Sequence, residues 1–140
     1  FGMDVTLAYP EGYHLMPSVM EKAHQFADDA GATITETHDM AEAFKDADFL
    51  YPKSWGPIMV TEDEKEVEAM AAKNTGWRVT QEKMALAKKH AVYMHCMPID
   101  RGHEADAEVI DGPQSVIYKQ AENRLHVQKA LMALIMGGRA

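Results

Sequence analysis

Residues 3–51 decide the fold, and they read MDVTLAYPEGYHLMPSVMEKAHQFADDAGATITETHDMAEAFKDADFLY. The apolar, β-branched run at 3–9 is followed by a proline and a glycine, which predicts a strand. From 17 to 30, apolar side chains recur at helical spacing between a proline at the start and a glycine after the end, which predicts a helix. Further strands are predicted over 32–37 and 48–51, which are short and rich in β-branched or aromatic residues.

A short helix completes the alternation of these strands. It is predicted to begin after Asp39, whose side chain can cap it, and to continue through Phe44. The order strand, helix, strand, helix, strand is typical of βαβ units, so we predict the α/β class: a three-layer, doubly wound parallel sheet with helices on both faces. Such sheets bind ligands at the carboxyl edge of their strands, so the residues that immediately follow each strand are the candidates for function.

The second half of the chain continues this pattern. In chain order we predict a charged helix over 61–74, a helix capped by Thr80, a strand over 91–94, an irregular acidic loop over 99–113, a strand over 115–118 and a long helix over 121–136. Two glycines follow the last helix and mark its end.

Composition narrows the class of protein. The chain has 140 residues, 46% of them hydrophobic and 26% charged, which is the balance of one globular domain. The formal net charge of -8 argues against a surface that coats nucleic acid, and no apolar run reaches the length of a membrane span. The single cysteine, Cys96, excludes an internal disulfide and a multi-cysteine zinc site. The chain enters its first strand directly after Phe1 and Gly2, with no signal peptide, so we expect it to be the interior of a longer protein.

Three segments carry candidate chemistry, and the first is His-Cys-Met-Pro at 95–98, at the end of a predicted strand. An imidazole and a thiol at the carboxyl edge of a sheet could polarise a carbonyl or line a pocket for a small polar ligand. Neighbouring residues of an extended chain point to opposite faces, so the two side chains need not form a nucleophilic pair. The alternative is a core cysteine beside a histidine whose hydrogen bonds are satisfied.

The other two segments are Glu-Asn-Arg at 122–124 and Lys-Ser-Trp-Gly-Pro at 53–57. Arg124, in the opening turn of the last predicted helix, would offer donors to a phosphate or carboxylate. Its alternative is a surface ion pair with an acidic neighbour such as Glu122. A lysine, a hydroxyl and an indole on a turn bounded by proline and glycine suit an amino-acid or carboxylate pocket, and the alternative there is a tryptophan packed as a lid on the sheet edge.

Other candidate sites are weaker. No two of the seven histidines stand at metal-ligand spacing with a carboxylate, and no glycine-rich phosphate loop is present in the sequence. His103 and Glu104 in the acidic loop could bind a cation weakly.

Taken together and in this order, the three segments resemble the ornithine and aspartate carbamoyltransferases, in their ornithine branch. Residues 95–98 are similar to the His-Cys-Leu-Pro motif of the family, with Met97 in place of the usual leucine. The similarity continues through Ile-Asp-Gly-Pro-Gln-Ser-Val at 110–116 and Ala-Glu-Asn-Arg-Leu-His-Val-Gln-Lys-Ala at 121–130. Residues 1–8 resemble the second strand of the family's amino-acid-binding domain, so the resemblance covers essentially the whole chain.

The resemblance implies that residues 1–140 are the amino-acid-binding domain of a two-domain subunit, without the first strand of that domain and without the carbamoyl-phosphate domain. It implies transfer of a carbamoyl group from carbamoyl phosphate to the amine of ornithine or a modified ornithine-like amino acid, in arginine metabolism. It also implies a cytoplasmic homotrimer that needs no metal or organic cofactor and binds neither nucleic acid nor membrane. Because the phosphate site belongs to the other domain, we expect this chain alone to be inactive.

The resemblance also implies roles for single residues. His95 would donate a hydrogen bond to the carbamoyl oxygen in the transition state, and Cys96 would position the acceptor amine. Main-chain carbonyls around Met97 and Pro98 would contact the amine or the carbamoyl nitrogen. Arg124 would hold the carbamoyl group or the phosphate.

One segment departs from the ordinary ornithine enzymes, which carry Asp-x-x-x-Ser-Met-Gly after the third strand. Here Lys53, Ser54 and Trp55 form a Lys-Ser-Trp-Gly segment that resembles the N-acetylornithine carbamoyltransferases and their uncharacterised knotted relatives. Loss of the aspartate removes a partner for a free α-ammonium group, and the lysine adds a partner for a carboxylate. The acceptor is therefore open between ornithine and a modified relative.

Two further readings of the whole chain are a catalytically inactive amino-acid-binding or regulatory homologue and a generic nucleotide-binding α/β domain. The second is disfavoured because the sequence has no glycine-rich loop.

Overall fold

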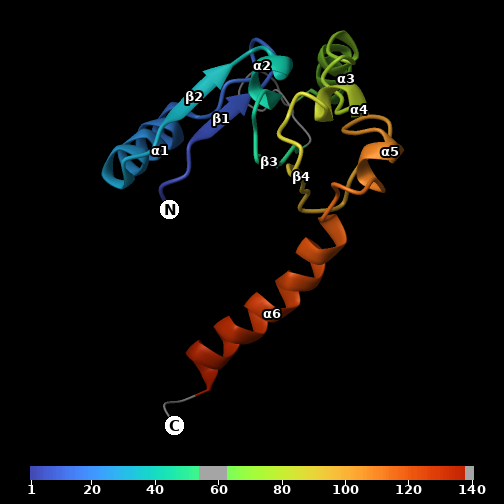
Figure 1. The fold of residues 1–140 in the computed structure, drawn as a ribbon. Coiled ribbons are helices and arrows are strands. Elements are labelled where there is room, and N and C mark those ends of the chain that lie inside the picture. The colour runs from blue at the N-terminus through green and yellow to red at the C-terminus, as the bar shows by residue number, and fades with distance from the viewer. Residues whose placement is uncertain (54–62, 138–140) are drawn as a thin grey trace.

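The computed structural model describes residues 1–53 and 63–137. Figure 1 shows the elements coloured in chain order. The strands and helices are β1 (Val5–Ala8), α1 (Pro17–Ala30), β2 (Ile34–Thr37), α2 (Met40–Phe44), β3 (Phe49–Leu50), α3 (Glu64–Lys73), α4 (Gln81–Met84), β4 (Val92–Tyr93), α5 (Ala107–Ile110) and α6 (Ile117–Met136).

The strands form two parallel pairs. β1 pairs with β2, with Val5 opposite Ile34, and β3 pairs with β4, with Leu50 opposite Tyr93. Parallel strands joined by helical crossovers confirm the predicted α/β class. Within residues 1–53 and 63–137, however, the strands form two two-stranded sheets rather than the one continuous sheet that we predicted.

Two helix ends form for the local reasons that the sequence indicates. α1 has Pro17 in its first turn and ends at Gly31, whose φ of 66° is a left-handed conformation that glycine adopts without a steric penalty. The Asp39 carboxylate caps α2 by accepting hydrogen bonds from the main-chain N–H groups of Ala41 and Glu42. Both predicted caps are confirmed.

The main hydrophobic core packs around β3 and β4. It also takes in α2, α4, α5 and the start of α6, and its buried members are Phe44, Leu50, Val79, Met84, Tyr93, Ala105, Val109, Ile110 and Ile117. Burial of each of the larger side chains contributes about 1.5–3 kcal/mol. This core therefore fixes the loops that leave the carboxyl ends of β3 and β4.

The prediction of a strand over 115–118 is wrong. Only Ser115 bridges to Tyr93, and the chain turns into α6 at Ile117. Ile117 is fully buried, whereas the residues that follow it are largely exposed. A helix buries this one β-branched side chain and lets the chain leave the core, whereas a strand would bury every second residue.

The predicted loop over 99–113 contains a helix that we did not predict. The helix is α5, and it buries Val109 and Ile110 in the core. With four residues it is too short for a helical period to be visible in the sequence.

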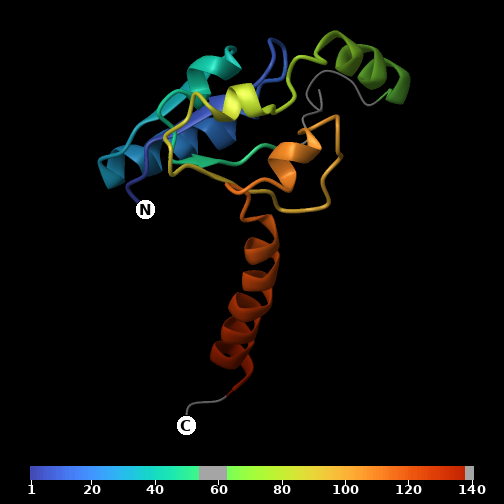
Figure 2. The ribbon, with the colours of Figure 1, turned by 45° about the vertical axis from the view of Figure 1, so that its right-hand side comes forward.

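α6 projects away from the rest of the chain, as both Figure 1 and Figure 2 show. Beyond its first turn it carries large exposed apolar side chains, which are Leu125, Val127, Leu131, Met132, Leu134, Ile135 and Met136. Among the described residues, no helix is both long enough and apolar enough to cross a membrane.

Candidate active site

The carboxyl ends of β3 and β4 lie side by side. Leu50 is opposite Tyr93 in the register, and the main-chain N–H of Met94 donates to the carbonyl oxygen of Leu50 at 2.8 Å. The segment after β3, which contains Lys53, therefore lies next to the His-Cys-Met-Pro turn after β4, as expected for parallel neighbours.

His95 is fully buried, and both of its ring nitrogens face other groups of the protein. Nδ1 accepts a hydrogen bond from the main-chain N–H of Met97 at 2.9 Å, so the proton of the neutral imidazole resides on Nε2. Nε2 lies 3.3 Å from Oε2 of Glu104, within ion-pair range although off the direction of a hydrogen bond. Nδ1 therefore has an internal hydrogen-bond partner, whereas Nε2 makes no hydrogen bond to any described residue.

Glu104, which the sequence indicated only as a weak cation ligand with His103, contacts His95 and Lys53. Its side chain is 4% exposed, and Oε2 accepts a hydrogen bond from the main-chain N–H of Asp100 at 2.8 Å. Oε1 lies 4.0 Å from Nζ of Lys53. Burial, and then the negative charge of Glu104, raise the pKa of the Tyr93 hydroxyl. No residue spacing could have shown this role, because an irregular loop brings Glu104 back to His95.

Gln120 joins α6 to the ends of both strands. Its Oε1 accepts a hydrogen bond from the main-chain N–H of His95 at 2.9 Å, and its Nε2 donates to the hydroxyl of Tyr51 at 2.9 Å. Gln120 therefore holds the start of α6 against the segment after β3 and the turn after β4.

The rest of the turn has an unusual backbone. Met97 has a positive φ of 59°, and the Met97–Pro98 peptide bond is cis. Cys96 is a partly exposed free thiol, whereas its neighbour His95 is fully buried. The two side chains therefore differ in environment, as expected for neighbours in an extended chain.

The other predicted substrate-binding segment is described only at its start. Lys53 is half-exposed, and its ammonium group faces the buried carboxylate of Glu104. Ser54 and Trp55 lie outside the described residues.

Arg124 lies deeper in α6 than the sequence indicated. Because α6 begins at Ile117, Arg124 belongs to the second turn and not to the opening turn, so an anion site made by the helix N-terminus does not include it. It follows Gln120 by one helical turn and lies on the same side of the helix, with its side chain exposed. Glu122 faces His126, with Oε1 and Nε2 4.0 Å apart.

A cavity of about 450 Å³ lies between β1 and β3. Residues 6–9 and 49–53 line two of its sides, and Trp77 and Glu104 contribute to it. Most of the lining is apolar, whereas Lys53 and Glu104 are the charged groups among the described lining residues.

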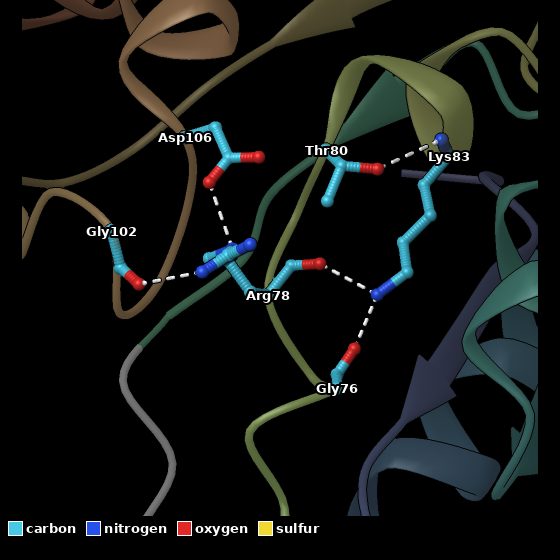
Figure 3. Close-up of polar contacts among 6 residues, drawn as sticks. All are labelled: Gly76, Arg78, Thr80, Lys83, Gly102 and Asp106. Atoms are coloured by element: carbon cyan, nitrogen blue, oxygen red, sulfur yellow. Dashed lines mark hydrogen bonds and ion pairs between the residues drawn. The ribbon is translucent and has the colours of Figure 1, made fainter.

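The loop that carries Glu104 is pinned to the segment before α4, as Figure 3 shows. Nε of Arg78 lies 2.8 Å from Oδ1 of Asp106, and an Arg78 guanidinium N–H donates to the carbonyl oxygen of Gly102 at 3.3 Å. Lys83 donates to the carbonyl oxygens of Arg78, at 2.6 Å, and of Gly76. Burial and then the neighbouring Arg78 charge lower the pKa of Lys83, and Asp106 opposes this effect.

The carboxyl ends of β1 and β2 also meet. Nδ1 of His38 donates to the carbonyl oxygen of Tyr9 at 2.8 Å, and the rings of Tyr9, His14 and His38 make edge-to-face contacts. A hydrogen bond to Glu36, together with burial, raises the pKa of Tyr9 to about 12. In the part of the chain that the structure describes, no three His, Cys, Asp or Glu side chains gather as a metal site would require.

The profile of the family "Aspartate/ornithine carbamoyltransferase, Asp/Orn binding domain" matches residues 1–135. The chain belongs to this family. It is the family that the motifs at 95–98 and 121–130 resemble, so that prediction is confirmed.

Similar proteins are carbamoyltransferases of the ornithine type. The ornithine carbamoyltransferase of Methanothermobacter thermautotrophicus is 46% identical over 136 residues, which cover 97% of this chain and 44% of that protein. The ornithine carbamoyltransferase of Thermococcus kodakarensis is 42% identical over 137 residues, with coverages of 98% and 42%. The chain thus spans less than half the length of these curated relatives.

Two solved structures that resemble the chain are of enzymes named for a modified ornithine. One is N-acetyl-L-ornithine transcarbamylase, with a TM-score of 0.90 and 36% identity over 96% of this chain and 41% of that one. Another is acetylornithine transcarbamylase complexed with acetylcitrulline, with a TM-score of 0.89, 36% identity and coverages of 96% and 40%.

Proposed function

We propose that residues 1–140 are the amino-acid-binding part of a carbamoyltransferase, which transfers the carbamoyl group of carbamoyl phosphate to the side-chain amine of ornithine or a modified ornithine-like amino acid. The observation that carries the proposal is the His-Cys-Met-Pro turn at the carboxyl end of β4, held by Gln120 and Glu104 in a chain that matches the family over residues 1–135.

The residues of this turn and of α6 take distinct parts in the proposed reaction. The neutral acceptor amine attacks the carbonyl carbon of carbamoyl phosphate, and the bond from that carbon to the phosphate oxygen breaks. The proton that the amine nitrogen loses passes to the departing phosphate. Cys96, partly exposed beside the turn, positions the amine, and the main-chain carbonyls around Met97 and Pro98 orient it. Arg124 provides a planar set of donors for the carbamoyl group or the phosphate. The Nε2–H of His95, which makes no hydrogen bond to Glu104, donates to the carbonyl oxygen as charge develops there.

The acceptor is proposed to present a carboxylate to Lys53, with Ser54 and Trp55 completing its pocket. Support comes from the position of the lysine ammonium group, which lies beside the Glu104 carboxylate. The same carboxylate contacts the ring of His95, so Lys53 and His95 belong to one site. A lysine suits a carboxylate, and residues 51–57 contain no aspartate to pair with a free α-ammonium group, which favours an acceptor whose α-amino group is acylated.

We also propose that a strand and a carbamoyl-phosphate domain outside residues 1–140 complete the enzyme. Parallel strands lie about 4.8 Å apart, so one strand in the cavity between β1 and β3 could pair with both. The strands would then form one sheet with helices on both faces, which is the three-layer arrangement. The complete enzyme is proposed to be a cytoplasmic homotrimer.

Steady-state assays of the full-length protein with a panel of acceptors test this proposal. Lys53→Met should raise KM for the acceptor by about 10- to 100-fold with a smaller change in kcat, because it removes one charge-assisted contact. Lys65→Met, at an exposed position of α3, is the matched control. If wild-type protein carbamoylates no acceptor, the proposal is wrong, and amino-acid binding without turnover would favour the inactive homologue. An unchanged KM in the Lys53 variant would contradict the role of that residue alone.

A further inference from the structure

The structure contains a buried carboxylate that the proposed reaction does not use directly. We infer that Glu104 is a positioning residue: it fixes the ring proton of His95 on Nε2 and so holds the turn that carries Cys96. This inference rests on the proposed function, because the turn is the centre of the proposed site.

The ring orientation of His95 is set by a contact at Nδ1. A main-chain N–H can only donate, so the 2.9 Å contact from Met97 makes Nδ1 the acceptor and leaves the proton of the neutral ring on Nε2. Nε2 lies 3.3 Å from Oε2 of Glu104, although its N–H does not point along the direction of a hydrogen bond to that oxygen. The negative charge of a carboxylate this close to Nε2 favours this tautomer over the one that carries its proton on Nδ1.

One carboxylate oxygen of Glu104, Oε2, contacts both His95 and the main chain beyond the turn. Oε2 of Glu104 also accepts the main-chain N–H of Asp100, at 2.8 Å. The same atom therefore fixes the ring at one end of the turn and the main chain just beyond its other end. Among the described residues, the titratable groups that also face this carboxylate include the Lys53 ammonium group, 4.0 Å from Oε1, and the Tyr93 hydroxyl.

These contacts of His95 and Glu104 maintain the backbone conformation of Met97. Met97 has a φ of 59°, a left-handed conformation that is unfavourable for a residue with a side chain, and its N–H is held by the ring of His95. If the ring rotates or changes tautomer, this hydrogen bond is lost and the turn can relax. The backbone of Cys96 and Met97, which orients the acceptor in the proposed reaction, would then move.

The test combines the tautomer of His95 with kinetics of the full-length protein. In wild-type protein labelled with ¹⁵N-histidine, long-range ¹H–¹⁵N spectra should show His95 protonated on Nε2 without substrate. Glu104→Met removes the acceptor oxygens at similar side-chain volume. It should give mixed tautomers and lower kcat on the order of 10-fold, with KM for carbamoyl phosphate changed less than about threefold.

The conservative variant separates positioning from folding. In Glu104→Gln the amide oxygen can occupy the place of Oε2, so we expect the wild-type tautomer and a kcat within about threefold of wild type. Glu108→Met, at an exposed position of α5, is the matched control and should behave as wild type.

Two results overturn the inference. One is a wild-type His95 protonated on Nδ1, a measurement that needs no variant and remains available if Glu104→Met does not fold. The other is a folded Glu104→Met protein that keeps one Nε2-protonated tautomer and the wild-type kcat. The tautomer is measured without turnover, so absence of carbamoyl transfer in wild type refutes the proposed function separately from this inference.

Discussion

Replacement of Gln120 by leucine removes two hydrogen bonds that join α6 to the ends of β3 and β4. The main-chain N–H of His95 donates to Oε1 at 2.9 Å, and Nε2 donates to the Tyr51 hydroxyl at 2.9 Å. The first bond belongs to a fully buried residue and contributes about 1–1.5 kcal/mol, whereas Tyr51 is 50% exposed and its bond contributes about 0.5 kcal/mol. We expect the free energy of opening the turn at 95–98 to fall by about 1.5–2 kcal/mol.

Native-state hydrogen exchange of the full-length protein measures this free energy at the His95 amide. A loss of about 1.5–2 kcal/mol corresponds to exchange that is about 10- to 30-fold faster. Gln128→Leu makes the same change at an exposed position of the same helix and should leave that amide as protected as in wild type. Equal exchange rates in the two variants would refute the reasoning, because they would mean that Gln120 does not hold the turn.

Two further predictions concern stability. Ile117→Ala should lower the free energy of unfolding, measured by urea denaturation, by about 3 kcal/mol, because Ile117 is fully buried in the core. Leu125→Ala, at an exposed position of the same helix, should lower it by less than about 0.5 kcal/mol. Equal losses in the two variants would contradict this account of α6. Hydrogen bonds from Lys88 and then His90 hold the pKa of Asp48 below its ordinary value of 3.8, so the stability that this carboxylate contributes is fully present above that value and is lost as pH falls through the lower, folded-state pKa. Asp48→Asn should therefore make the loss of stability below about pH 4 shallower in acid unfolding followed by circular dichroism, and an identical acid profile would contradict the assignment.

The fold could be predicted from the sequence where its signals are local. The proline at the start of α1, the glycine after it and the aspartate before α2 act through their own backbone neighbours, and their helix ends agree with the structure. The start of α6 could not be predicted in this way. Val116 and Ile117 have strand-like side chains, and only the burial of Ile117 in the core and the bridge from Ser115 to Tyr93 decide where the strand pairing stops.

The candidate site was predictable in part. Its motif residues could be named because they are consecutive, and the parallel order of the strands places Lys53 near His95. The contacts of Glu104 and Gln120 with His95 could not be predicted, since each residue reaches His95 through folding of the chain and not through a spacing in the sequence. The shift of Arg124 from the first helical turn to the second follows from the error at the start of α6.

Carbamoyl transfer by the full-length protein tests the central claim most directly. With ¹³C-labelled carbamoyl phosphate and either ornithine or N-acetylornithine, the account predicts that the label moves into a ureido product as phosphate is released. Decay of carbamoyl phosphate at the enzyme-free rate, with no labelled ureido product from either acceptor, would contradict it.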